Sequence, residues 1–379
     1  MEQSEAKPGA AVILDREGLD RLLETLAAEG FRVLGPVARD GAVTYAPVRS
    51  TADLPVGLRD RQEGGVYRLE SGRPEALFDY VHGPHTWKHH LFPPEQRLWR
   101  AERDGRGFRI ESGADDEPPL ALVGVRACEL RAMAIQDRVF DNGQFAEPGY
   151  LGRRGKSFVV AVNCTRAGGT CFCSSMHADG PHASGGYDLA LTEVMEAGAH
   201  WFLVETGSES GARVLERLPG RATAPAERSA AFDAVEQAAA AMGREMPPEA
   251  VDLLRCNVEH PRWDDVAGRC LSCGNCTLVC PTCFCSTVED VTDLAGDVAE
   301  RWRRWDSCFN LEFSYIHGGS VRRQVSARYR QWITHKLSTW WEQFGSSGCV
   351  GCGRCITWCP VGIDITAEVR AIRDSEERG

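Results

Sequence analysis

Two cysteine runs near one end of the sequence constrain the fold more than any other feature. Both have the spacing C-x2-C-x2-C-x3-C-P: Cys270, Cys273, Cys276, Cys280 and Pro281 form the first, and Cys349, Cys352, Cys355, Cys359 and Pro360 form the second. This spacing is typical of 4Fe–4S sites. Three thiolates come from one tight loop, and a fourth from further along the chain closes the cage. The sequence therefore predicts two cubane sites.

When two such runs are present, the fourth cysteine of each usually serves the other cluster. We therefore expect one cluster on Cys270, Cys273, Cys276 and Cys359, and a second on Cys349, Cys352, Cys355 and Cys280. Zinc is the alternative metal for a tetrahedral sulfur site, although it is usually bound by two separated C-x2-C pairs. A zinc-stapled scaffold without a redox role therefore stays open.

Bulk properties limit the class of protein. The 379 residues carry a formal charge of −11, which argues against general nucleic-acid binding. No apolar run is long enough to span a membrane. The N-terminal stretch MEQSEAKPGAAVILDREGLD lacks the pattern of a signal peptide, so we expect a cytoplasmic protein. In that reducing compartment, the 16 cysteines indicate metal ligation rather than disulfides.

Apolar runs alternate with helical stretches in the central region. LALVGV (120–125), KSFVVAVN (156–163) and HWFLVETG (200–207) predict a parallel sheet covered on both faces. Upstream, Asp15 and Gly30 are the expected start and stop signals of a helix. The stretch HTWKHHLFPPEQRLW (85–99) is expected to be a surface loop.

The predicted fold class is an α/β N-terminal and central region followed by a C-terminal dicluster ferredoxin domain. We expect an α+β region at 1–118, an α/β region at 119–225, and a helical dicluster domain at 226–379. A helical insertion at about 288–345 would split that last domain. Residues 301–336 of that insertion hold eight Lys or Arg and two Asp or Glu. This positive charge would offset anionic clusters, dock an acidic partner, or form a solvated face.

The word TCFC occurs twice, and its first copy suggests a third site. Cys128 closely follows LALVGV and Cys164 directly follows FVVAVN, so both lie at the carboxyl ends of predicted parallel strands, where ligands collect. Cys171 and Cys173 lie on the glycine-rich loop after Cys164. We predict a third 4Fe–4S site from these four cysteines without help from other domains. The alternative is that they are buried thiols.

The second TCFC holds Cys283 and Cys285, directly after the first cysteine run. Cys308 and Cys256 are the remaining cysteines. We expect buried structural thiols beside the second cluster, with a fourth metal site as the alternative.

Motifs for substrate chemistry are missing from the sequence. No G-x-G-x-x-G marks a nicotinamide or flavin site. GRRGKS (152–157) resembles a phosphate-binding loop only superficially, because Tyr150 replaces the first glycine and a strand is predicted to follow. We therefore predict no catalytic residues and no nucleotide-binding residues.

Five segments resemble a known family: GVRACELRAM, LGRRGKSFVVAVNCTRAGGTCFC, CLSCGNCTLVCPTCFC, RYRQW–HK and GCVGCGRCITWCPVGIDIT. They resemble the iron–sulfur beta subunit of sulfhydrogenases, which are cytoplasmic NAD(P)-linked nickel–iron hydrogenases of group 3b type. The resemblance runs from about residue 85 onward. It implies a non-catalytic redox subunit and carries the family's cluster cysteines over to the eight positions of the two runs.

The resemblance also implies partners. A flavin subunit with FAD would exchange hydride with NAD(P)H, and the small and large subunits of a nickel–iron hydrogenase would lie beyond this chain. The same segments are similar to the electron-transfer subunit of anaerobic sulfite reductase, so that complex stays open as an alternative. A stand-alone flavin and iron–sulfur reductase is an alternative of another class.

Overall fold

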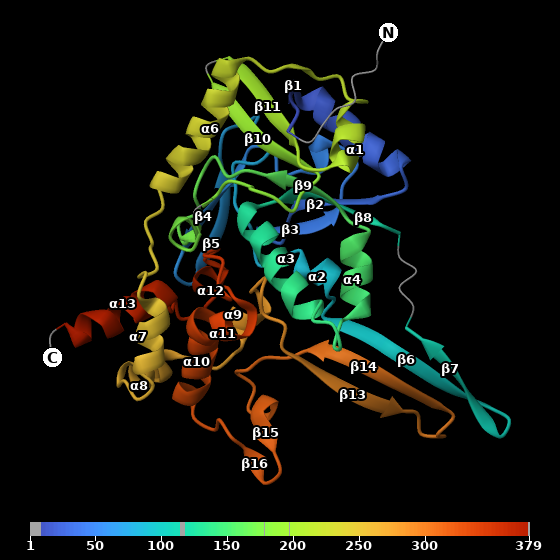
Figure 1. Ribbon diagram of the computed structural model, residues 1–379, viewed down its shortest axis with the longest axis vertical. Helices are drawn as coiled ribbons and strands as arrows, with labels where there is room; N and C mark the ends of the chain where they lie inside the picture. Colours follow the sequence, from blue (N-terminus) through green and yellow to red (C-terminus); the bar gives the residue numbers. More distant parts are fainter. Residues whose placement is uncertain (1–8, 114–117, 178, 197, 378–379) are drawn as a thin grey trace.

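The computed structural model describes residues 9–113, 118–177, 179–196 and 198–377. Residues 1–8, the start of the stretch expected to lack a signal peptide, lie outside the described residues. Figure 1 shows a large sheet with its helices in the upper half of the view, the C-terminal domain below it, and a four-stranded sheet reaching to the lower right. Within these described ranges, no helix has the length and apolarity needed to cross a bilayer.

Eight strands form the large sheet in the order β12-β1-β11-β10-β9-β8-β2-β3. Their bounds are β1 (Ala11–Leu14), β2 (Arg32–Arg39), β3 (Ala42–Pro47), β8 (Leu120–Val125), β9 (Phe158–Val162), β10 (Leu189–Glu196), β11 (Ala199–Thr206) and β12 (Arg221–Ala222). The four strands β2, β8, β9 and β10 run parallel. The expected α/β architecture is confirmed.

The flanking strands depart from the purely parallel expectation. HWFLVETG forms β11, which runs antiparallel to β10. Only two residues separate these strands, too few for the crossover that a parallel pair needs. In addition, β2 pairs with β8. The expected boundary at residue 119 therefore runs through a single sheet, and residues 1–118 and 119–225 are not separate units.

Helices cover both faces of this sheet, as predicted. Ala121 and Val123 of β8 share a core with α1 (Arg16–Ala28) and α5 (Glu209–Leu215), whereas Leu120 and Leu122 share one with α3 (Ala127–Phe140) and α4 (Pro148–Gly155). The long helix α6 (Pro225–Ala240) packs on β10 and β11. The predicted start of α1 is confirmed, because the Asp15 side chain accepts a hydrogen bond from the Gly18 N–H at 2.9 Å.

A second sheet joins distant parts of the chain in the order β13-β14-β6-β7. Its strands are β6 (Glu95–Asp104), β7 (Gly107–Ser112), β13 (Ser286–Thr292) and β14 (Val298–Trp305). The expectation of a surface loop at 85–99 is wrong. Trp87, Leu91 and Phe92 are buried around α2 (Lys88–Leu91), and Trp87 stacks on Tyr45 at 3.9 Å. These aromatic side chains form core because burying them is favourable.

The C-terminal domain is mostly helical. Its helices are α7 (Ala250–Cys256), α8 (Arg262–Arg269), α9 (Asn275–Leu278), α10 (Val325–Thr334), α11 (Trp340–Phe344), α12 (Arg354–Thr357) and α13 (Ile365–Glu376), with a π-helical turn at His335–Thr339. The insertion between the cysteine runs is helical only in its second half. Its first half forms β13, β14 and the hairpin β15 (Tyr315–Ile316) and β16 (Gly319–Ser320). A further hairpin, β4 (Leu58–Glu63) with β5 (Val66–Ser71), lies in the N-terminal region.

Candidate metal centres

The first predicted ligand set lines one cavity. Cys270 directly follows α8, Cys273 comes next in a tight loop, and Cys276 is the second residue of α9. These three cysteines and Cys359, from the second run, line a small cavity whose walls include the apolar side chains Phe309, Tyr329, Trp332 and Ile363. Cys355, which we assigned to the second set, lines the same cavity, so the assignment of Cys359 to the first cluster stays a prediction.

A left-handed turn shapes that loop. Gly274 has a φ of +71°, and a Cβ there would lie 2.9 Å from the Ser307 hydroxyl oxygen. The Ser272 N–H points at the Cys270 sulfur at 3.4 Å. Backbone N–H groups directed at sulfur stabilise negative charge on it, as an iron–sulfur site requires.

The second predicted set gathers around the loop that starts at Cys349. Burial and the thiolates of Cys349, Cys352 and Cys280 raise the pKa of the Cys355 thiol well above its usual value. Burial likewise raises the pKa of Cys349 to about 12. Burial also raises the pKa of Cys352. Three buried thiols with raised pKa values are costly to ionise alone, so this donor set suits a cationic metal core that neutralises them.

A buried lysine contacts this second set. Lys336 Nζ lies 3.1 Å from Cys280 Sγ, 3.0 Å from Thr282 Oγ1 and 3.0 Å from the Gly348 carbonyl oxygen. Burial alone would lower the pKa of Lys336, but the Cys280, Cys283 and Cys349 thiolates outweigh burial and raise it well above its usual value. The side chain is therefore a fixed positive charge. It lies in the π-helical turn, a distortion that often marks functional sites.

The sequence pattern did not single out Lys336 among the basic residues of 301–336. Their contacts in the structure distinguish these basic residues from one another. Arg301 pairs with Asp290, Arg303 with Glu147 and Arg304 with Glu95. Lys336 instead hydrogen-bonds a cysteine, so it offsets charge directly at a predicted cluster ligand. Arg328 of the same group places positive charge near Cys270 of the first set.

The four cysteines of the third predicted set also come together. Cys128 lies in the first turn of α3 after β8, and Cys164 follows β9, as the strand-end argument predicted. Burial, and then the Cys164 and Cys352 thiolates, raise the pKa of Cys171 to about 12. Burial and the Cys171, Cys164 and Cys352 thiolates raise the pKa of Cys173 above its usual range. For Cys128, the causes are burial, Cys352 and Cys173.

Cys352 belongs to the second run, so a loop of the C-terminal domain lies against the third set. The Gly351 carbonyl accepts a hydrogen bond from the Phe172 N–H at 2.8 Å. Gly351 and Gly353 have φ values of +68° and +73°, and a Cβ at either would collide with the backbone of the first TCFC. Glycine at these two positions thus allows two cysteine loops to pack backbone to backbone.

Two arginines beside the third set were also missed by sequence reasoning. Arg126 Nη1 lies 3.9 Å from Cys164 Sγ and donates to the Asn163 carbonyl at 3.1 Å. Arg354, which lies between Cys352 and Cys355 in the chain, forms a fully buried ion pair with Glu129 beside Cys128. These charges lie beside the second and third sets, but nothing in the sequence pattern marks either arginine.

The second TCFC is arranged differently from the first. Cys283 lies beside Cys280, and Cys285 lies beside Cys308. These thiols lie beside the second set, where we expected structural thiols. Cys256 ends α7 and is exposed.

Single-ion binding fits these cysteines poorly. Among the residues that the structure describes, no three His, Cys, Asp or Glu side chains are arranged to hold one metal ion. The thiolates of a cubane bind four different irons and therefore need not converge on one point. The cysteine-rich, apolar surroundings fit a cluster better than a structural zinc.

Two comparisons with known proteins agree with this geometry. A family model described as a 4Fe–4S dicluster domain matches residues 269–363, which implies two 4Fe–4S clusters. The beta subunit of sulfhydrogenase 2 from Pyrococcus furiosus is 30% identical over 333 residues, covering 83% of this chain and 91% of that protein. The chain therefore belongs to the family of sulfhydrogenase beta subunits, as an iron–sulfur electron-transfer subunit.

Proposed function

We propose that this chain relays single electrons through three 4Fe–4S clusters, between a flavin subunit that oxidises NAD(P)H and the small subunit of a nickel–iron hydrogenase. FAD and NAD(P) would bind the flavin subunit, and the nickel–iron site would lie in a large subunit. The proposed ligands are Cys270, Cys273, Cys276 and Cys359 for the first cluster, Cys349, Cys352, Cys355 and Cys280 for the second, and Cys128, Cys164, Cys171 and Cys173 for the third.

The observation that carries this proposal is the continuity of the three cysteine sets. The pKa of Cys276, in the first set, is raised by burial and by thiolates that include Cys280 of the second. Cys352 of the second set acts in the same way on Cys128, Cys171 and Cys173 of the third. Clusters on these ligands would be neighbours, and close spacing is what a relay requires.

The chain's own residues would tune and protect these clusters. The aromatic core around the first set, including Phe309, Tyr329 and Trp332, excludes water. Lys336 and Arg126 place positive charge beside sulfur ligands of the second and third sets. Positive charge favours the reduced cluster and raises its potential, whereas burial without it lowers that potential.

One end of the relay reaches the surface. Cys273 is exposed, and its neighbour Leu271 keeps 63% of its surface accessible. An exposed apolar side chain beside a cluster ligand supports electron exchange at this end with a partner subunit. The name of the Pyrococcus furiosus relative supports a hydrogenase as the assembly involved.

The test is the iron and acid-labile sulfide content of the chain purified without air. We expect about twelve irons per chain, four for each cluster. Cys128→Ala should lose about four of them, whereas the matched variant Cys256→Ala, at an exposed cysteine outside the three sets, should lose none. About eight irons in the unsubstituted chain would leave the third set as structural thiols. Zinc without sulfide would overturn the relay itself.

Copurification tests the partners. Native complexes should contain hydrogenase subunits together with a flavin subunit, and they should evolve hydrogen from NAD(P)H. A complex that reduces sulfite and lacks hydrogenase subunits would instead identify the anaerobic sulfite reductase assembly. Flavin absorbance in the isolated chain would favour a stand-alone reductase.

A further inference from the structure

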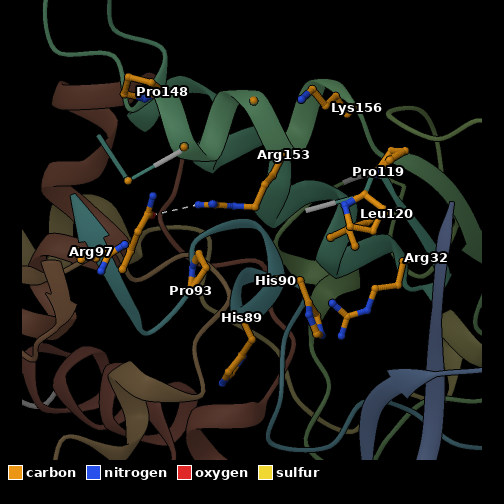
Figure 2. Close-up of a pocket in the computed structure, with 15 residues that line it drawn as sticks. Arg32, His89, His90, Pro93, Arg97, Pro119, Leu120, Pro148, Arg153 and Lys156 are labelled. Atoms are coloured by element: carbon orange, nitrogen blue, oxygen red, sulfur yellow. Dashed lines mark hydrogen bonds between the residues drawn. The ribbon is translucent and has the colours of Figure 1, made fainter. Parts of the chain in front are cut away.

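Two cysteines outside the three proposed ligand sets line a cavity. The cavity of Figure 2, where Arg153 reaches from α4 toward Arg97, has no cysteine among its described lining residues. A different cavity, with a volume of about 310 Å³, is lined by both Cys285 and Cys308. Both of these cysteines are partly exposed, and none of the predicted cluster ligands lines the cavity. A small molecule in it would therefore meet these two thiols before any cluster ligand.

Strand pairing brings the two cysteines together. β13 and β14 are antiparallel, and Ser286 pairs with Trp305 at the end of their ladder. One position further, the Cys285 carbonyl accepts a hydrogen bond from the Asp306 N–H at 2.8 Å. Cys308 follows Asp306 by two residues, and its side chain lies beside that of Cys285. The fold thus places two thiols from separate segments next to each other.

The surroundings favour one thiolate and one thiol. The neighbouring Cys308, together with the Lys88 and Lys336 charges, outweighs burial and lowers the pKa of Cys285 to about 7. Lys88 is held in place, because its Nζ donates to the Cys283 carbonyl at 2.9 Å. The Cys285 thiolate, together with burial, raises the pKa of Cys308. In thiol–disulfide exchange a thiolate is the nucleophile, and a second thiol within reach completes the reaction.

The rest of the lining suits a small ligand. Apolar and polar side chains alternate around the two thiols: Phe284, Phe313, Trp332, Arg322, Gln331 and His335. Among the described residues that line the cavity, none is Asp or Glu, so no carboxylate there opposes a thiolate. The volume lies at the lower end of the range for small-molecule sites. The cavity therefore fits a low-molecular-weight compound better than a protein thiol.

We propose that Cys285 and Cys308 form a redox-active dithiol that exchanges with a low-molecular-weight disulfide in this cavity. Cys285 attacks one sulfur of that disulfide, whose S–S bond breaks and releases one thiol. Cys308 then attacks the Cys285 sulfur of the mixed disulfide and releases the second thiol. The two cysteines together lose two electrons and two protons, and the small disulfide gains them. No cluster takes part, so the exchange does not rest on the proposed relay.

Hydroxyethyl disulfide, added without air to the full-length chain with its metal centres intact, tests the proposal. Remaining thiols are then alkylated, and peptide mass spectrometry identifies the sulfur bonds. We expect a disulfide between Cys285 and Cys308 in most chains. Cys308→Ser should stop the reaction after its first step and leave mercaptoethanol on Cys285. The control Cys256→Ser, at an exposed cysteine outside the cavity, should leave the Cys285–Cys308 disulfide unchanged.

Three outcomes would overturn the proposal. The first is no Cys285–Cys308 disulfide in the unsubstituted chain, and the second is no adduct on Cys285 in Cys308→Ser. The third is loss of about four irons in Cys285→Ser or Cys308→Ser, which would identify ligands of a further cluster. If Cys308→Ser fails to fold, the unsubstituted chain decides, because dithiothreitol should return both free thiols. A chain without iron that still forms this disulfide would contradict the relay and support the dithiol.

Discussion

Lys336 Nζ donates a hydrogen bond to Cys280 Sγ at 3.1 Å, and both side chains are buried. Cys280 is the residue that leaves the first cysteine run to complete the second set. A positive charge therefore sits at the point where the two predicted clusters interlock, and it is fixed there by Thr282 and Gly348.

Replacing Lys336 should change the reduction potential of the second predicted cluster. Lys336→Met should lower the reduction potential of the cluster on Cys280 by roughly 0.1 V, because a unit charge about 5 Å away contributes about 3 kcal/mol at an effective dielectric near 20. EPR-monitored redox titration measures this shift. Lys336→Arg keeps the charge and should move the potential much less. Equal potentials in the methionine variant and the unsubstituted protein, at equal iron content, would show that Lys336 is only structural.

Loss of the first cluster should uncouple the proposed complex. Cys273→Ala should remove that cluster and reduce NAD(P)H-dependent hydrogen evolution at least about tenfold, while NAD(P)H oxidation by an artificial acceptor at the flavin persists. Both rates are measured on the purified complex, with Cys256→Ala as the matched cysteine variant. Coupled activity that survives without the cluster would contradict the relay.

The Glu129–Arg354 pair should behave as one unit. Arg354→Met leaves a buried carboxylate without its partner and should lower the free energy of unfolding by about 3–5 kcal/mol. The double variant Glu129→Gln, Arg354→Met should recover part of that loss, since no isolated charge remains. Anaerobic urea unfolding measures both values. Simple additivity of the two single substitutions would argue against a coupled pair.

Close contact between the cysteine loops should depend on Gly353. In Gly353→Ala the new Cβ would lie 2.2 Å from the Thr170 carbonyl oxygen, on a backbone with positive φ. We expect a lower melting temperature and loss of about four irons from the third set. The control is Gly243→Ala, where a Cβ meets nothing within 4 Å. Unchanged iron content in Gly353→Ala would show that the third site does not depend on this contact.

Acid should destabilise the protein through the partly buried His89. Burial, with help from the neighbouring His85 and Lys88 charges, lowers the pKa of His89 to about 3. An unfolded histidine titrates near 6.5, so below that pH the unfolded chain takes up a proton that the folded chain does not. The contribution of His89 to the free energy of unfolding is therefore fully present above a pH of about 6.5, and it is lost progressively as the pH is lowered further. His89 should account for about 1 kcal/mol between pH of about 7 and 5.5.

Urea midpoints at the two pH values measure that loss. His89→Gln should flatten the pH dependence, and His317→Gln, at an exposed histidine, should not. A pH dependence that His89→Gln leaves unchanged would show that other groups cause it.

The sequence pattern predicted the chemistry of the site better than its surroundings. Cysteine spacing is local, because one loop supplies three ligands, so Cys270, Cys273 and Cys276 could be grouped without a structure. The strand-end argument also brought Cys128 and Cys164 together, because parallel strands place their carboxyl ends at one edge. Cysteine spacing could not show which residues from distant parts of the chain lie beside each group of cysteines. Cys352 beside the third set, Lys336 at Cys280, and Glu129 with Arg354 are contacts between segments far apart in the chain.

Errors in the fold had a similar origin. Residues 85–99 were expected to be a loop because of two prolines and several polar side chains, yet Trp87 and Phe92 are core residues and Glu95 begins a strand. The partner strand, β14, lies about 200 positions further along the chain. A window of sequence around residue 95 contains nothing of that partner, so its pairing could not be predicted locally.

That pairing has a consequence for how the protein is made. β6 leaves the ribosome long before β14, so one edge of β6 stays without its hydrogen-bonding partner until residue 305 has been synthesised. The four-stranded sheet therefore cannot be completed by the N-terminal part of the chain alone. A fragment that contains only the C-terminal cysteine-rich part would likewise lack β6 and β7, which complete the sheet formed by its insertion. We therefore expect the cysteine-rich domain to need the N-terminal region of the same chain in order to fold.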